Sequence, residues 1–541
     1  MDEKVIIEQP ANRQIARAAG TVMVAFIISN IVGVIRGMVI TNAFGTTADL
    51  DSFNAANRIA ELLFNLVAGG ALGSAFIPVF TTFITKDDRR GAWNLASGVV
   101  NLLTLVLVVI SALAWLFAPQ IVSRGLFVLV PESDPVQIDL TIRLLRIMLP
   151  SVIIFGISGL VMGMLNAHQV FLVPALAPVM YSMGMIFGTL VLPREWGVQR
   201  LAIGVVLGAL LHLVVQVPSV LHLKDRFYQV TLGLKNKAVI EVLKLMGPRL
   251  LGAAVVQLNF ITNTIIALGQ PEGSVSSITL AFALMLMPQM AIAQSAAIAS
   301  LPTFSAQVAG GKMDELRHSL ASTLRVVLFL AIPASLGLIL LRVPLVQVLY
   351  QRGEFSAQST AMVAWALLWY AAGLVGHSLV EILSRAFYAL HDTRTPVIVG
   401  VCAMGLNILF SILFSAGFQQ MGWMPHGGLA LANSLATALE SIVLLFLMRN
   451  RLAGLEGRHI LKGLSQALLT SGVMCAAIWG WSVWAGERSA LGYLLGGLLL
   501  GVISYGLVAW LMRITELRSL LELIKSKVKN TKLPGKKPGQ L

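Results

Sequence analysis

Long apolar stretches, separated by short polar segments, run along almost the whole chain. A helix that crosses a bilayer needs about 20 mostly apolar residues, and stretches of that length recur from residue 19 to residue 513. The pattern predicts fourteen spans, at residues 19–42, 52–83, 93–118, 138–165, 171–192, 201–222, 241–268, 275–300, 320–343, 361–389, 396–418, 427–448, 463–485 and 490–513. We therefore expect an all-α integral membrane protein.

Composition supports the same class. The chain has 541 residues, of which 57% are hydrophobic and 12% charged, whereas soluble domains carry about 25% charged residues. So few charges cannot cover the surface of a soluble protein of this length. The two cysteines, Cys402 and Cys475, lie inside apolar runs, so we expect neither a disulfide framework nor a CxxC metal site.

Basic residues predict the orientation. The net charge is +14, and Lys and Arg collect on the cytoplasmic side of membrane proteins. They gather at the N-terminus, in every second loop and in the tail, which predicts that both termini are cytoplasmic. Because this charge lies between apolar spans, we expect no nucleic-acid partner, and we expect the basic tail, residues 514–541, to contact membrane lipids.

Two weak internal matches occur at nearly one offset. Residues 71–78 resemble residues 295–302, an offset of 224, and residues 167–174 resemble residues 389–396, an offset of 222. Six spans separate the copies, so both enter the membrane in the same direction, which is typical of two-lobed transporters. The predicted organisation is an N-lobe at 1–222, a cytoplasmic linker at 223–240, a C-lobe at 241–450, two further helices at 451–513 and the basic tail.

The tenth predicted span carries three ionisable residues on one helical face. His377, Glu381 and Arg385 are spaced at i, i+4 and i+8, so they can neutralise one another. One interpretation is a proton relay or coupling site in which Glu381 titrates. The other, which we favour, is a polar clamp between helices, because structural ion pairs also occur in bundles.

Two arginines in the first two spans are candidates for binding an anion. Arg36 and Arg58 can line a cavity, and the planar guanidinium suits phosphate. The alternative is that they pair with Asp51 and Glu61, since Arg58 and Glu61 stand at i and i+3. Both interpretations stay open. The chain has no phosphate-binding GxxxxGK[ST] loop and no HExxH or Gly-x-Ser-x-Gly motif, so we expect a transporter and not an enzyme.

Several motifs together resemble one family. They follow the chain in order, at residues 43–53, 69–79, 146–150, 165–167 with 174–178, 349–355 and 387–396. They resemble the MurJ/MviN family of lipid II flippases, within the multidrug/oligosaccharidyl-lipid/polysaccharide exporter superfamily. The resemblance covers most of the first twelve predicted spans.

The resemblance implies two lobes around a central cavity, with a groove for a polyprenyl tail formed by the last two spans. The implied activity moves the undecaprenyl-pyrophosphate peptidoglycan precursor from the inner to the outer leaflet of the bacterial cytoplasmic membrane by alternating access, with no cofactor. The implied partners are this undecaprenyl-linked glycolipid, membrane lipids and the peptidoglycan synthesis machinery. Arg36 and Asp51 fall where members carry Arg and Asp, and with Arg58 and Asn30 they form the predicted substrate site.

The chain also departs from the family pattern. Asn30 and Phe64 replace arginines of the family's cavity, Gly69 replaces an acidic residue, and Ala283 and Leu286 replace an Arg and a Glu. These departures leave three alternatives open: a flippase for another undecaprenyl-linked glycan, a cation-coupled multidrug exporter of the same superfamily, and a scaffold that transports nothing.

The coupling ion is a separate question. Some members carry a sodium site between the seventh, eleventh and twelfth spans, where this chain offers the amide oxygens of Asn259, Asn407 and Asn433 but no carboxylate on the eleventh span. We therefore predict no firm metal site, with these three residues as candidates. Coupling to the membrane potential, to H⁺ or to Na⁺ stays open.

Overall fold

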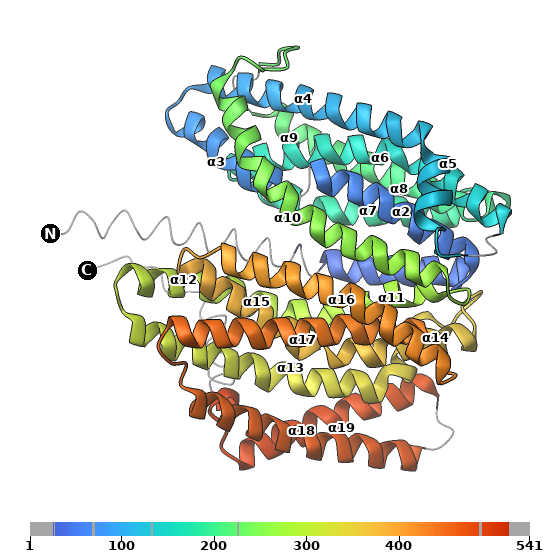
Figure 1. The fold of residues 1–541 in the computed structure, drawn as a ribbon, viewed down its shortest axis with the longest axis vertical. Coiled ribbons are helices and arrows are strands. Elements are labelled where there is room, and N and C mark those ends of the chain that lie inside the picture. The colour runs from blue at the N-terminus through green and yellow to red at the C-terminus, as the bar shows by residue number, and fades with distance from the viewer. Residues whose placement is uncertain are drawn as a thin grey trace, which may run out of the picture. The chain divides into compact units, whose positions relative to one another are not determined.

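The computed structural model describes residue 25 and residues 28–67, 71–130, 134–223, 227–485 and 489–518. Within these ranges the chain is helical throughout and contains no strand (Figure 1). Ten described helices are long and apolar enough to cross a membrane, and the bent pair α14–α15 makes an eleventh. The first helix (Ile28–Phe44), α2–α3 and α10 occupy the remaining three predicted spans. The predicted class, an all-α integral membrane protein, is confirmed.

The chain packs as two compact units. The first holds residues 1–277 and 350–359, and the second holds residues 278–349 and 360–541. After the first helix, the elements that begin within residues 1–277 are α2 (Ala48–Val67), α3 (Ala71–Thr85), α4 (Arg89–Leu116), α5 (Ala118–Gln120), the π-helix η1 (Ile121–Leu126), α6 (Pro135–Ala167), α7 (Leu172–Val191), the 3₁₀-helix η2 (Arg194–Trp196), α8 (Gln199–Val214), α9 (Val217–Leu221), α10 (Lys237–Leu268) and α11 (Ser274–Gln289). The remaining elements are the π-helix η3 (Met290–Gln294), α12 (Ser295–Ala309), α13 (Met313–Tyr350), α14 (Ala357–Ala372), α15 (Leu374–Ala389), α16 (Arg394–Gln420), α17 (His426–Arg451), α18 (Gly457–Ala485) and α19 (Ala490–Leu511).

Helix α10 packs with the first unit, against α2 and α3. The predicted C-lobe begins at residue 241, inside this helix. The predicted lobe boundaries stay a prediction, and the packing units differ from them in the placement of α10. The predicted basic tail beyond residue 518 and Gly69 lie outside the described residues.

Two turns that lie at the offset of the predicted internal repeat have the same backbone geometry. The turn from α6 to α7 contains Gln169 at φ 61°, and the turn from α15 to α16 contains His391 at φ 59°. Both helices end in the same hydrogen bond from the residue after the positive-φ position, as in a Schellman motif. These bonds run from Val170 N–H to the Leu165 carbonyl at 2.9 Å and from Asp392 N–H to the Phe387 carbonyl at 3.0 Å. The offset is 222, as in the sequence match.

A second pair of turns matches at the other offset. Asp87, after α3, has φ 53°, and Gly311, after α12, has φ 68°. The following N–H groups again bond back into the helix, from Asp88 to the Phe83 carbonyl at 3.0 Å and from Lys312 to the Gln307 carbonyl at 2.9 Å. This offset is 224. The ends of α16, α17 and α19 have the same geometry, with positive φ at Gly422, Ala453 and Arg513. This turn is therefore common in the chain, and the repeat stays a prediction.

Helices α7 and α8 touch through glycine. A Cβ at Gly184 would lie 2.2 Å from the Cα of Gly208, and one at Gly188 would lie 2.6 Å from the Cα of Gly204. Each helix therefore carries a Gly-x-x-x-Gly pair on the contact face, the pattern that lets backbones of membrane helices approach closely.

The bend between α14 and α15 is 44°. It falls at Gly373, whose N–H bonds to the Tyr370 carbonyl at 3.0 Å instead of continuing the α-helical ladder. The Trp369 carbonyl accepts a hydrogen bond from the hydroxyl of Ser434 on α17 at 2.7 Å. A neighbouring helix thus satisfies the backbone group that the bend releases, as buried membrane helices require.

Helices α18 and α19 pack on α13 around a buried ion pair. Arg325 Nε lies 2.5 Å from Glu516 Oε1, and the two side chains are 5% and 8% exposed. The guanidinium also donates to the ring of His459. A Cβ at Gly463 would lie 2.8 Å from Arg325 Nε, so this glycine makes the room that the arginine occupies.

Candidate functional site

A cavity of about 210 Å³ lies inside the first unit, between α2, α6, α7 and α8. Its lining combines a carboxylate and an amide from α2 with aromatic rings from α2, α6 and α7 and an imidazole from α8. The lining residues are Asn57, Ala60, Glu61, Phe64, Ser151, Val152, Phe155, Pro178, Tyr181, Val205 and His212. The predicted substrate residues Arg36 and Arg58 do not line this cavity themselves. Each contacts a residue that does: Arg36 lies against the ring of Tyr181, and Arg58 pairs with the carboxylate of Glu61.

The aromatic wall is centred on Phe155 of α6. Its ring lies 5.8 Å from that of Phe64, 5.1 Å from that of Tyr181 and 5.4 Å from that of His212, measured between centroids. The contacts with Tyr181 and His212 are edge-to-face, the arrangement that the ring quadrupoles favour. Phe64, which stands where the resemblance implies an arginine, makes this part of the wall apolar.

The protonation of His212 follows from its neighbours. Gln216 Nε2 lies 2.8 Å from the carbonyl of His212, so this atom is the amide nitrogen, and it also donates to Ser158 Oγ at 2.8 Å. Ser158 then donates its own proton to His212 Nδ1, which lies 2.7 Å away. We infer that the neutral ring carries its proton on Nε2. His212 therefore brings a hydrogen-bond donor to the cavity wall.

Arg36 contacts this wall from the first helix. Its guanidinium carbon lies 5.8 Å from the centre of the Tyr181 ring, and Nη1 donates to Ser182 Oγ at 3.4 Å. No ion pair of Arg36 is found among the described residues. The predicted alternative, an Arg36–Asp51 pair, is therefore absent from the described part of the chain, and the guanidinium keeps its charge for another partner.

Arg58 is paired locally. Its Nη1 lies 2.8 Å from Glu61 Oε2, and the guanidinium stacks 4.9 Å from the ring centre of Phe260 on α10. Asn57 donates to the other carboxylate oxygen of Glu61 at 2.9 Å. The predicted Arg58–Glu61 pair is confirmed. An anionic ligand that uses Arg58 must therefore compete with Glu61.

Asp51 and Asn30 occupy different surroundings. The Asp51 side chain is 4% exposed and accepts backbone hydrogen bonds from Gly273 at 2.8 Å and Ser276 at 2.7 Å. Both of its oxygens thus hold the start of α11, where a carboxylate compensates unpaired N–H groups. Asn30 lies exposed on the first helix. A role of either residue in substrate binding stays a prediction.

In the second unit, the three predicted residues of α15 divide into two contacts. His377 Nε2 lies 3.0 Å from Asn433 Oδ1 on α17, and Glu381 forms an ion pair with Arg385 at 2.8 Å. The His377 contact joins α15 to α17, as the clamp interpretation requires, whereas Glu381 and Arg385 pair within α15. The relay and the clamp both stay predictions.

The three candidate sodium ligands have other partners. Asn433 bonds to His377, Asn407 Oδ1 accepts from Ser411 at 3.1 Å, and Asn259 Oδ1 accepts from Asn263 at 3.3 Å. The described residues contain no group of three or more His, Cys, Asp or Glu side chains that could hold a metal ion. A sodium site stays a prediction.

Several residues of the cavity region could not be found from the sequence. The lining residues Phe155 and Tyr181, and Ser158, which contacts His212, gave no signal, because single aromatic or hydroxyl residues are common in apolar spans. The spacing of His212 and Gln216 at i and i+4 was a usable signal, since two polar residues on one face of a span indicate a polar contact inside the bundle.

Comparisons with known proteins agree with this architecture. A structure titled lipid II flippase MurJ, inward closed conformation, superposes with a TM-score of 0.77 at 24% identity, covering 92% of this chain and 99% of that one. An inward-facing transporter of the multidrug MATE family reaches 0.67 at 16% identity, covering 79% and 96%. At these identities the likeness shows the fold alone, a bundle of membrane-spanning helices.

The sequence comparisons identify the family. The model described as lipid II flippase MurJ matches residues 40–500. A lipid II flippase MurJ from Burkholderia cenocepacia is 31% identical over 483 residues, covering 86% of this chain and 91% of the relative. A probable lipid II flippase MurJ from Vibrio cholerae is 29% identical over 539 residues, covering 96% and 100%. The chain belongs to the MurJ family of lipid II flippases.

Proposed function

We propose that this chain is a lipid II flippase, which moves the undecaprenyl-pyrophosphate-linked peptidoglycan precursor from the inner to the outer leaflet by alternating access. The family match over residues 40–500 carries the proposal. The substrate has a charged head and a long apolar tail, so the protein must offer the head a polar route while the tail stays in lipid.

Arg36 is the residue that we propose to bind the pyrophosphate. A guanidinium binds phosphate oxygens in a bidentate manner, and it does so best where no carboxylate competes. Arg36 has no ion-pair partner among the described residues and lies against Tyr181 on the cavity wall. Arg58 pairs with Glu61 in this structure. It contributes a second guanidinium to the anion once the anion has displaced the Glu61 carboxylate.

Complementation tests the proposal. In a strain depleted of its own lipid II flippase, we expect the wild-type chain to restore growth and Arg36→Ala to fail, with partial rescue by Arg36→Lys. Arg146→Ala is the matched control, because Arg146 stacks 4.5 Å from the ring centre of Trp115, away from this cavity. Failure of the wild-type chain itself would refute the function. Rescue by a double Arg36→Ala, Arg58→Ala variant would refute the role of the arginines.

A flippase for another undecaprenyl-linked glycan is the second candidate. It is favoured by Asn30 and Phe64, which stand where the family's cavity has arginines. Appearance of labelled lipid II on the outer face of proteoliposomes that contain the purified protein would decide against it. Transport of a different undecaprenyl-linked glycan alone would decide for it.

We further propose that both termini are cytoplasmic and that transport is driven by the membrane potential or by H⁺ or Na⁺. Cysteine labelling from each side of the membrane tests the orientation. Dissipating each gradient separately in proteoliposomes tests the driving force. Contact with the peptidoglycan synthesis machinery is likewise a proposal, to be tested by crosslinking in cells.

A further inference from the structure

The segment between α9 and α10 is bound to the side of α4. We call residues 227–236 the linker strap. The Asn101 side chain donates to the carbonyls of Gln229 and Thr231, both at 2.9 Å, and the Gln229 N–H donates to Ser97 Oγ at 3.2 Å. Asn101 in turn accepts from the Tyr228 hydroxyl at 2.5 Å. The strap is therefore fixed to α4 by its backbone.

A pair of glycines brings the two segments together. A Cβ at Gly98 would lie 3.3 Å from the Cα of Gly233, and Gly233 itself has φ 60°. A side chain at either position would push the strap away from the helix, or strain the turn at Gly233. The contact shows that the strap follows the surface of α4 closely.

The face of α4 under the strap continues as a lipid-facing stripe. The stripe begins with Asn94, Gly98 and Asn101 and continues at helical spacing through residues 105, 108 and 112. These last three residues are exposed, Leu105 by 46% and Val108 by 43%. Helix α4 is a 28-residue candidate span. The strap therefore covers the first turns of a surface that, one turn further on, faces the bilayer.

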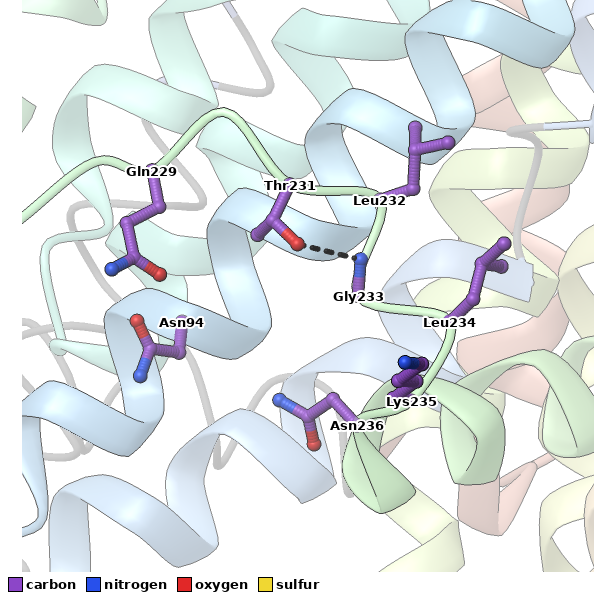
Figure 2. A pocket seen from close by; sticks show the side chains of 8 residues that line it. All are labelled: Asn94, Gln229, Thr231, Leu232, Gly233, Leu234, Lys235 and Asn236. Carbon is purple, nitrogen blue, oxygen red and sulfur yellow. Dashed lines mark hydrogen bonds between the residues drawn. The ribbon is translucent and has the colours of Figure 1, made fainter.

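The outward side of the strap is apolar. Its side chains alternate, as in any extended segment, and the alternate positions that face away from α4 are occupied by large apolar residues. They are Val230, Leu232 and Leu234, exposed by 93%, 37% and 59%. Figure 2 shows Leu232 and Leu234 pointing away from Asn94. A row of three exposed apolar side chains is unfavourable in water.

A polar cavity of about 490 Å³ lies between the strap and α4. Figure 2 shows the carboxamides of Asn94 and Gln229 and the side chains of Lys235 and Asn236 around it. Asn94 Oδ1 is buried and accepts no hydrogen bond from the described residues. Lys235 is exposed and forms no ion pair in the described part of the chain. The cavity thus offers one exposed cation, Lys235, to an anionic ligand.

We propose that the linker strap anchors the protein in the membrane interface by binding an anionic phospholipid. The three apolar side chains enter the acyl region, and Lys235 pairs with the lipid phosphate. Interfacial segments bind membranes by this combination of buried apolar area and attraction to anionic lipid. The inference does not depend on the proposed function, and its tests need no transport substrate.

The first test measures the depth of the strap. A nitroxide label is placed on Val230→Cys in full-length protein that also carries Cys402→Ala and Cys475→Ala, in bilayer nanodiscs. We expect collisions with oxygen to exceed those with a water-soluble nickel complex, as for a label on the lipid-facing Leu113→Cys. A label on Glu195→Cys, in the exposed loop before α8, is the aqueous reference. Accessibility of residue 230 equal to that reference would overturn the proposal.

The second test measures the lipid phosphate contact. We expect phosphatidylglycerol to raise the thermal unfolding midpoint of the wild-type protein in nanodiscs more than phosphatidylcholine does. Lys235→Gln should weaken the affinity for phosphatidylglycerol about fivefold, which is the typical contribution of one lysine to binding at an anionic membrane surface. Lys312→Gln, which removes an exposed lysine paired with Glu315, should leave it unchanged. An unchanged affinity in Lys235→Gln, or equal stabilisation by soluble glycerophosphate, would overturn the proposal.

Discussion

The turn between α6 and α7 and the turn between α15 and α16 share a backbone but not a chemistry. Both place a positive-φ residue, Gln169 or His391, one position before an N–H that bonds back into the helix. The following residue is Val170 in the first turn and Asp392 in the second. The comparison teaches that the two turns share the hydrogen bonds that end their helices, while the side chains around them differ.

The interiors of the two units also differ in how their polar side chains are paired. The first unit has a cavity with Arg36 unpaired beside it and a donor from His212 on its wall. In the second unit, the polar side chains discussed above meet one another, in the His377–Asn433, Glu381–Arg385 and Arg325–Glu516 contacts. We therefore expect substitutions in the first unit to affect ligand binding most, and those in the second to affect stability most.

The largest expected effect is on stability in the second unit. Glu516→Ala leaves Arg325 buried without its counter-charge, which costs about 3–5 kcal/mol for a buried ion pair. We expect a large fall in the thermal unfolding midpoint in detergent. Glu315→Ala breaks the exposed pair with Lys312 and should cost less than about 1 kcal/mol. A Glu516→Ala protein as stable as the wild type would contradict the assignment of this pair.

Asp51 gives the corresponding test in the first unit. Asp51→Ala leaves two buried N–H groups at the start of α11 without an acceptor, each worth about 1–3 kcal/mol. We expect a lower unfolding midpoint, with Asp51→Asn intermediate because its carbonyl oxygen still accepts. The exposed neighbour Asp49→Ala serves as the control. If Asp51→Ala lost transport with an unchanged midpoint, a direct role in substrate binding would replace the structural one.

The repeat itself can be tested at the matching turns. Glycine adopts positive φ without the steric cost that a Cβ adds, about 1 kcal/mol. Both Gln169 and His391 are exposed, so we expect the steric cost of the Cβ to dominate the effect of a substitution there. At each position we expect the glycine variant to be more stable than the alanine variant by about 1 kcal/mol, measured as a difference in unfolding midpoint. A preference for glycine at one turn only would contradict the shared geometry.

The smallest expected effect depends on pH. The Asp392 carboxylate accepts hydrogen bonds from the Thr395 N–H at 3.1 Å and hydroxyl at 2.8 Å, and these bonds hold its pKa below the ordinary value. The contribution of the Asp392 carboxylate to the free energy of unfolding is therefore fully present above the pKa of the unfolded state, about 4. It is lost as the pH falls through the lower pKa of the folded state. We expect the stability difference between wild type and Asp392→Asn to shrink on acidification below about pH 4. Val170→Asn, at the matching position, should not change the acid dependence.

The sequence predicted the membrane class and the order of the spans, because each rests on a pattern many residues long. It also predicted the Arg58–Glu61 pair, which is local to one helix. It did not predict that Phe155 meets His212, or that Arg325 lies beside Glu516. Those contacts join residues more than fifty positions apart, and single residues within apolar spans carry no signal of their partners.

The glycine contact between α7 and α8 limits how the cavity can change shape. Tyr181 and His212 lie on these two helices, and the helices approach backbone to backbone, so a side chain at Gly184 or Gly188 would have to push them apart. We expect α7 and α8 to move together as one wall when the cavity changes shape, with α2 and α6 moving against it.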